Sequence, residues 1–149
     1  MTYHVTVDYS QPVSDMIEAG KYDHIESSWQ NPRAQQEMQE HIGGTGRVEV
    51  VIELREYRND CGPNGIKCQM EADGYRPVTI GEFLMLGATQ PQLQTEQAML
   101  CFLYYLGNDL VCMRLASSDS QRRLDFEWLL GGTANKPDGQ LHTFPVIKK

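Results

Sequence analysis

Apolar and polar residues alternate with a period of two in several stretches, a pattern typical of β-strands with one buried face. The clearest stretches cover residues 3–9, 47–55, 123–130 and 141–147. Charges of both signs occupy the polar positions of 47–55, so one face of that strand is expected to meet solvent. Pro145 lacks a backbone N–H, which favours an edge position for the last strand.

Residues 100–115 are apolar at nearly every position on either side of Gly107-Asn108-Asp109, a turn sequence rich in residues that accept left-handed conformations. Strict alternation places Phe102 and Tyr104 on one face of this hairpin and Tyr105 on the other. Because both faces are apolar, we expect the hairpin to lie in the middle of the sheet with both faces covered.

Thr79 and Glu82 have the spacing of a capping box, in which each side chain accepts a hydrogen bond from the backbone N–H of the other residue. The pair predicts that a helix begins here, and Gly87 is expected to end it in a left-handed conformation. Asn31 and Pro32 predict the N-cap and the first residue of another helix, which has few apolar residues and is expected at the surface.

Helical signals dominate the middle of the chain, and antiparallel strand signals dominate its end. The sequence therefore predicts an α+β domain, with a mostly antiparallel sheet and short helices packed on it. No linker or internal repeat interrupts the 149 residues, so residues 1–149 are expected to form a single globular domain.

The charge of the chain argues against nucleic acid as a partner. The chain is 40% hydrophobic and 22% charged, with a formal net charge of −7. Nucleic-acid binding needs a basic stripe that displaces counterions from phosphate, and the basic residues here are dispersed, so no nucleic-acid partner is expected. The longest apolar run is too short to cross a bilayer and no basic, apolar leader opens the sequence, so we expect a cytoplasmic protein without membrane contact.

Neither a metal nor a cofactor is expected. The four cysteines form no C-x2-C pair, and six residues separate Cys61 from Cys68, more than structural zinc sites use. Gly43-Gly44-Thr45-Gly46 has the glycines of a phosphate loop, but it follows a helix and opens a strand, which reverses the order that presents a helix N-terminus to phosphate. Cys101 and Cys112 sit in apolar strands and are expected to pack as small hydrophobes.

Catalytic chemistry has few candidates. Tyr22, Asp23 and His24 are adjacent, and with Glu82 they are the first residues to consider if the protein is an enzyme whose site is assembled from scattered positions. Trp128 shares its strand parity with apolar neighbours, which favours burial in the core, and a stacking platform for a ligand is the alternative.

Three stretches carry a resemblance to a known group of proteins. They are Asp8-Tyr9-Ser10 with Met16–Asp23, Gly74–Gln94, and Arg122-Arg123-Leu124 with Trp128 and Val146–Lys149. In these stretches the chain resembles a family of short, functionally uncharacterised bacterial and phage-type proteins. The resemblance implies one intact domain and allows carriage by a phage or other mobile element, and it implies no particular activity, substrate or cofactor.

We expect a small binding or regulatory protein that acts through protein–protein contact. The segment between Leu130 and Leu141 lacks helix and strand signals, and loops on a rigid sheet concentrate recognition residues, so a partner is expected on the C-terminal third instead of the helix after Asn31. The expected partner-binding residues are Asp119, Arg122, Arg123, Lys136 and Asp138. The alternatives are the enzyme and a structural subunit of a homo-oligomer.

Overall fold

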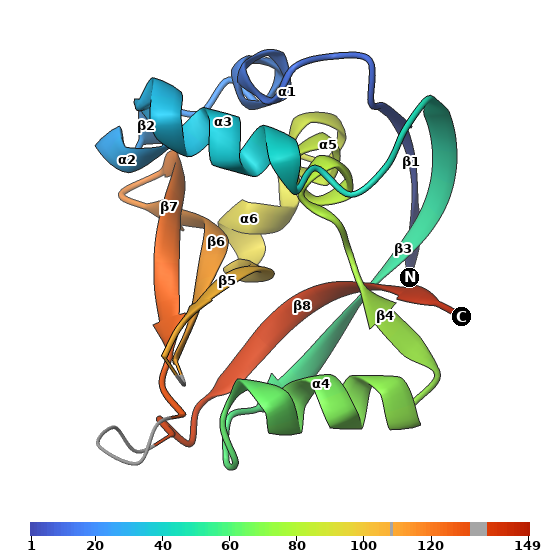
Figure 1. Cartoon of the computed structure of the whole chain (residues 1–149), viewed down its shortest axis with the longest axis vertical. Helices are drawn as coiled ribbons and strands as arrows, with labels where there is room; N and C mark the ends of the chain where they lie inside the picture. Colours follow the sequence, from blue (N-terminus) through green and yellow to red (C-terminus); the bar gives the residue numbers. More distant parts are fainter. Residues whose placement is uncertain (108, 132–136) are drawn as a thin grey trace.

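The structure of the chain, a computed structural model, describes residues 1–107, 109–131 and 137–149. Two four-stranded sheets and short helices make up the fold (Figure 1). The first sheet has the order β1 (Thr2–Asp8), β3 (Arg47–Arg58), β8 (Leu141–Lys148) and β4 (Tyr75–Pro77). The second has the order β2 (His24–Ile25), β7 (Gln121–Leu129), β6 (Asp109–Ser118) and β5 (Met99–Leu106).

Among the described strands, β2 pairs with β7 in parallel and the other pairings are antiparallel. The predicted α+β class is therefore confirmed, with the strands divided over two sheets. The helices are α1 (Val13–Ala19), α2 (Ser27–Gln30), α3 (Pro32–Glu40), α4 (Pro63–Ala72), α5 (Ile80–Thr89) and α6 (Leu93–Glu96). Figure 1 shows α1, α3 and α5 grouped toward one end of the molecule, and α4 at the opposite end.

Over β1 and the first half of β3, the first sheet buries one face and exposes the other, as the alternation in β3 predicts. Val5 and Val7 of β1 lie opposite Val50 and Val48 of β3, and both β1 valines are buried. The residues of the other face include Glu49, which is exposed to solvent. The period-two pattern is thus produced by one apolar face that packs against the helices. Farther along β3, Tyr57 on the second face is buried with Phe144 and Val146 of β8 against α4.

The position of β8 differs from the edge placement that Pro145 suggests. β8 lies between β3 and β4, so the edge prediction is wrong for the strand as a whole. β4, however, pairs only with residues 146–148, and Pro145 has a strand partner on the β3 side, Leu54. Proline is accommodated here because the neighbouring strand is too short to reach it.

The capping box at the start of α5 is confirmed. The Glu82 backbone N–H donates to Thr79 Oγ1 over 3.1 Å, and the Thr79 backbone N–H donates to Glu82 Oε1 over 2.7 Å. Gly87, in contrast, does not end the helix, which continues to Thr89. A Cβ at Gly87 would lie 2.4 Å from the Tyr22 hydroxyl oxygen, so close packing requires glycine at this position.

Both faces of the second sheet contribute to the core. Met113 and Leu115 of β6 pack with the helices and β1, whereas Leu110 and Cys112 pack with α4 and β8. The prediction of a hairpin with two covered faces is therefore confirmed for β6. Its partner β5 is an edge strand, so the predicted central position is wrong for β5.

Candidate functional site

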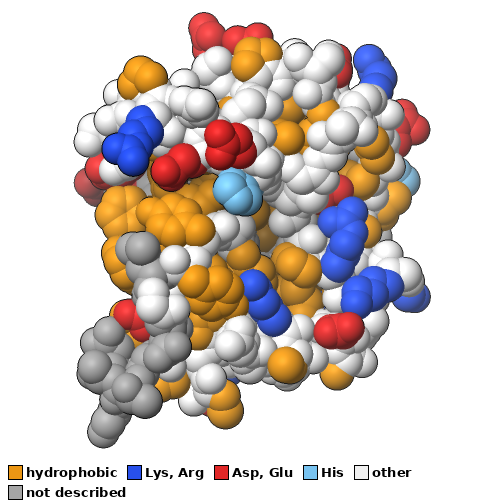
Figure 2. Space-filling view, in the orientation of Figure 1, with side chains coloured by type: hydrophobic (Ala, Val, Ile, Leu, Met, Phe, Trp, Pro, Cys, Tyr) orange, Lys and Arg blue, Asp and Glu red, His pale blue; other side chains and the backbone are white. Residues whose placement is uncertain are grey.

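A groove of about 370 Å³ lies between the second sheet and the helices α2 and α3, and we call it the aromatic groove. Its sheet wall consists of Leu103, Tyr104, Val111, Phe126 and Trp128. Its helical wall consists of Ser28, Trp29, Ala34, Glu37, Met38, Glu40 and His41. In Figure 2, hydrophobic side chains gather on this face of the molecule, with acidic side chains and a histidine along one edge of the patch.

The register between β6 and β7 places the apolar side chains of the sheet wall on one face. Trp128 lies opposite Val111, and Phe126 lies opposite Met113, so all four side chains share one face of the sheet. Leu124, two residues earlier, is fully buried, but Phe126 and Trp128 are 38% and 40% exposed. The predicted burial of Trp128 is therefore wrong, although its strand parity was inferred correctly. The helices cover this face at the beginning of β7 and leave its end open.

A β-bulge brings Tyr104 into the groove. Phe102 pairs with Cys112 and Tyr104 pairs with Val111, so Leu103 is an extra residue without a partner in β6. One inserted residue reverses the alternation that follows it. Tyr104 therefore lies on the Val111 face, and the prediction that it shares a face with Phe102 is wrong.

Residues around Asn31 position the helical wall. As predicted, Asn31 caps α3: its side-chain oxygen accepts from the Arg33 backbone N–H over 2.9 Å, and Pro32 is the first helical residue. The buried Trp29 indole N–H donates to the backbone oxygen of Asp125 over 2.8 Å. These contacts attach α2 and the start of α3 to β7.

Trp29 also contacts the aromatic residues of the sheet. Its ring meets Phe126 edge to face, with 6.5 Å between centroids and an interplanar angle of 86°. This geometry is one that aromatic pairs prefer. Because Trp29 is 5% exposed and Phe126 is 38% exposed, the pair connects the buried core to the open part of the groove.

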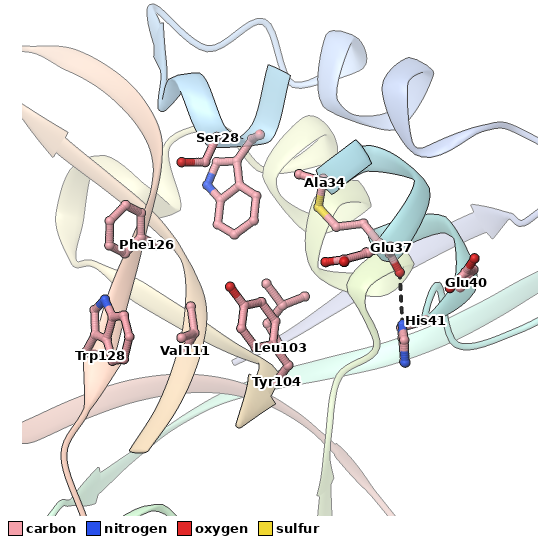
Figure 3. Close-up of a pocket in the computed structure, with 12 residues that line it drawn as sticks. Ser28, Ala34, Glu37, Glu40, His41, Leu103, Tyr104, Val111, Phe126 and Trp128 are labelled. Atoms are coloured by element: carbon pink, nitrogen blue, oxygen red, sulfur yellow. Dashed lines mark hydrogen bonds between the residues drawn. The ribbon is translucent and has the colours of Figure 1, made fainter. Parts of the chain in front are cut away.

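The exposed rim on α3 is acidic. Glu37 and Glu40 are exposed and line the groove, and Figure 3 shows Glu37 on the groove side of α3, with Glu40 farther out near His41. His41 Nδ1 lies 2.9 Å from the backbone oxygen of Glu37 (Figure 3). A carbonyl oxygen can only accept, so Nδ1 carries the proton, and Nε2 of the neutral ring is an acceptor.

The described polar side chains that line the groove are few and do not contact one another as a nucleophile–base pair. Among the hydrogen bonds of the described residues, none joins Ser28 to His41, so the contact between nucleophile and base that acyl transfer requires is not made. No group of three or more His, Cys, Asp or Glu side chains in the described part of the chain could hold a metal ion. Concave, mostly apolar walls with a few polar groups are typical of binding sites.

A second pocket, also of about 370 Å³, is polar and includes Arg114, Glu127 and His142 among its lining residues. His142 Nε2 lies 3.0 Å from Asp138 Oδ2. Asp138 Oδ1 also accepts from the Gln140 backbone N–H over 2.8 Å. Both bonds are local in sequence, so their evident effect is to stabilise the turn that enters β8.

Arg122, an expected partner-binding residue, is part of the internal structure. Its guanidinium donates to the backbone oxygens of Gly20 and Gly87 and to Gln94 Oε1, over 2.6, 2.9 and 2.9 Å. It also lies over the Tyr22 ring, 5.0 Å from the centroid. These contacts join α1, α5 and α6 to β7, and they leave the guanidinium little capacity to bind a partner.

Of the other expected partner-binding residues, those that the structure describes lie at both ends of β7, with Asp119 and Arg123 near Arg122 and Asp138 after the opposite end. Asp119 lies in the turn between β6 and β7 with φ of 51°. Half-buried Arg123 lies in β7 opposite Ala116. Asp138 follows the far end of β7, a strand of nine residues. Lys136 lies outside the described residues.

The candidate catalytic residues do not converge either. Burial raises the pKa of the Tyr22 phenol, and the Asp23 carboxylate accepts from the Arg122 backbone N–H over 2.7 Å. His24 is exposed at the edge of the second sheet. Glu82 is buried in α5, where Arg76 forms two hydrogen bonds of 3.0 Å with its carboxylate.

Comparisons of the chain with protein-family models, with curated proteins and with solved structures found no match. The family resemblance therefore stays a prediction. None of the helices in the described part of the chain is long and apolar enough to span a membrane.

Proposed function

We propose that the protein binds an apolar segment of a partner protein in the aromatic groove. The observation that carries this proposal is the convergence of three large aromatic side chains on one concave surface while they remain open to solvent. Tyr104, Phe126 and Trp128 are 45%, 38% and 40% exposed. Contiguous exposed apolar surface of this kind is typical of interaction sites, and aromatic residues are enriched among those that dominate binding energy.

The exposed aromatic area sets the scale of the affinity. A fully buried aromatic side chain covers about 150–250 Å², so covering the exposed part of each ring removes about 80 Å² from water. At about 25 cal/mol per Å², three rings contribute about 6 kcal/mol. The loss of translational and rotational freedom on association opposes this term, and the apolar surface that the partner buries adds to it. A net binding free energy of this size is typical of a transient complex.

Two adjacent tyrosines provide a matched test. Tyr104 lines the groove, whereas Tyr105 lies on the other face, and they are 45% and 41% exposed. A displayed library of random peptides is selected on the wild-type protein, and the enriched peptides are measured on both alanine variants. Tyr104→Ala is expected to weaken binding by about tenfold or more, while Tyr105→Ala leaves it unchanged, with thermal unfolding confirming that both variants fold.

Two results would contradict the proposal. One is a selection that enriches no peptide whose binding depends on Tyr104. The other is an equal loss of binding in the Tyr104 and Tyr105 variants, which would place the contact outside the groove.

An enzyme is the second candidate function. The observation that favours it is the half-buried Asp138–His142 pair, of which His142 lines the polar pocket, since a carboxylate can orient an imidazole as a general base. Hydrolysis of p-nitrophenyl acetate or p-nitrophenyl phosphate that disappears in His142→Gln would support the enzyme. Equal background rates for wild type and variant would contradict it.

The proposal includes the cytoplasm as the compartment and a phage or other mobile element as the carrier. Support for the compartment comes from the exposed, unpaired Cys61 and Cys68, because exposed thiols persist where the environment is reducing. Support for the carrier comes from the family resemblance alone. A structural subunit of a homo-oligomer is the remaining alternative, and the molar mass in solution tests it.

A further inference from the structure

The charged residues that line the aromatic groove have one sign. Glu37 and Glu40 are the acidic lining residues, and none of the described residues that line the groove is Lys or Arg. The formal net charge of the chain, −7, has the same sign. A ligand that approaches the groove therefore meets a local and a long-range negative potential.

The aromatic walls add a second attraction for cations. The faces of tryptophan, tyrosine and phenylalanine rings attract ammonium and guanidinium groups that lie within about 6 Å of the ring centroid. Trp128, Tyr104 and Phe126 are exposed on the sheet wall, across the groove from the acidic residues of α3 (Figure 3). A positive group next to an apolar one could contact the ring faces and the carboxylates at the same time.

His41 adds a hydrogen-bond acceptor to the acidic rim. Its Nδ1 proton is used in the bond to the Glu37 backbone oxygen, so Nε2 of the neutral ring accepts a hydrogen bond and does not donate one. Lysine and arginine side chains carry donors and no acceptors. In the neutral form of the ring, Nε2 of His41 therefore matches a basic side chain.

We infer that the segment bound in the aromatic groove presents a large apolar side chain flanked by lysine or arginine. This inference rests on the proposed function and names the chemistry of the partner. The apolar side chain lies between Trp128, Phe126 and Tyr104, and the basic flank lies against Glu37 and Glu40. The partner is therefore a protein with a basic, apolar segment on its surface.

A second copy of this chain fits the groove poorly. In a two-fold symmetric dimer built on this face, both copies bring Glu37 and Glu40 to the interface, and the net charge of −7 on each copy adds to the repulsion. Nucleic acid is disfavoured for the same reason, because phosphate would approach carboxylates. Charge complementarity thus selects a different, basic protein.

The test uses one peptide enriched from the random library, synthesised in two forms. Its apolar core is kept, and the flanking residues are lysine in one form and glutamate in the other. Wild-type protein is expected to bind the lysine form about tenfold more tightly than the glutamate form, the scale of a few partly exposed charge pairs. Added salt is expected to reduce the ratio.

Two double variants separate the rim from the net charge. Glu37→Gln with Glu40→Gln is expected to bring the ratio close to one while binding of the apolar core remains. Glu49→Gln with Glu53→Gln makes the same change in net charge in β3 of the first sheet, away from the groove. This variant is expected to keep the preference for the lysine peptide.

The outcomes distinguish this inference from the proposed function. Equal affinity of the two peptides for the wild-type protein would overturn the inference while leaving groove binding intact. A preference that survives the Glu37 and Glu40 changes would also overturn it. Loss of dependence on Tyr104 for both peptides would overturn the proposed function itself.

Discussion

Tyr104 lies opposite Val111 in the β5–β6 hairpin, although strict alternation from Phe102 would place it on the other face of the sheet. The cause is the unpaired Leu103, which reverses the alternation for the rest of β5. If Leu103 paired with Val111 in regular alternation, Tyr104 would lie on the other face and would not line the aromatic groove.

Deletion of Leu103 is expected to remove the bulge and to keep Tyr104 opposite Val111. Because Leu103 has no partner, its removal leaves Phe102 opposite Cys112 and Tyr104 opposite Val111. The variant loses the contacts of one partly buried leucine, which is expected to lower the free energy of unfolding by about 1–2 kcal/mol. A nuclear Overhauser effect between the Tyr104 ring and the Val111 methyl groups checks the register. Its replacement by an effect between Tyr105 and Val111 would show that the bulge is assigned to the wrong residue.

The capping box predicts a defined stability change. Thr79→Ala removes the acceptor for the Glu82 backbone N–H and is expected to lower the free energy of unfolding by about 1 kcal/mol. Thr79→Ser keeps the hydroxyl and serves as the control, with a smaller loss. Denaturant unfolding measures both, and equal midpoints for the serine and alanine variants would argue against a contribution from the cap.

The cysteines are expected to react in two classes. Cys61 and Cys68 are exposed, whereas Cys101 and Cys112 are buried, and burial raises the pKa of the Cys101 and Cys112 thiols. Since the thiolate is the reactive form, titration of the reduced, folded protein is expected to detect two thiols and titration after unfolding all four. Rapid reaction of a third thiol in the folded protein would contradict the placement of β5 or β6.

Asp125 is expected to make stability depend on pH. Burial raises the pKa of its carboxyl above the ordinary 3.8, with the nearby Arg114 acting in the opposite direction. The folded state therefore holds the proton more tightly than the unfolded chain, and this group lowers the free energy of unfolding as the pH rises through the window above 3.8. Asp125→Asn is thus expected to raise the thermal midpoint near neutral pH more than in acid.

Glu49→Gln is the control for this prediction, because it removes the same charge from a carboxyl that is exposed to solvent. A midpoint difference between Asp125→Asn and wild type that is the same at acidic and neutral pH would contradict it.

The sequence predicts the parts of the fold that depend on neighbours along the chain. The capping pair Thr79 and Glu82, the cap at Asn31 and the alternation in β3 follow from local hydrogen bonding and periodicity, and the structure confirms them. Features that depend on distant partners were missed. Gly87 is a glycine because Tyr22 packs against it, and the exposure of Trp128 depends on how far the helices extend over the sheet.

The aromatic groove itself could be predicted only in part. The sequence alternation places Trp128 on the same strand face as its apolar neighbours. It leaves two interpretations for this side chain, burial in the core and a stacking platform for a ligand. Tyr104 reaches the groove through a bulge that contains no glycine or other local signal. Glu37 and His41 lie on or next to α3, which the sequence places apart from the expected partner surface. The preceding helix α2 is attached to β7 by the Trp29 bond to Asp125, a long-range contact that the sequence does not show.

The most direct test of the account is a two-dimensional NMR titration of the full chain with the tightest peptide from the random library. The account predicts that the resonances of Tyr104, Val111, Phe126 and Trp128 shift together with those of residues 37–41, because both walls of the groove contact the ligand. The resonances of Glu49 and Glu53 in β3 are expected to stay in place. Shifts that gather around His142 and Arg114 instead, with the groove unchanged, would contradict the account.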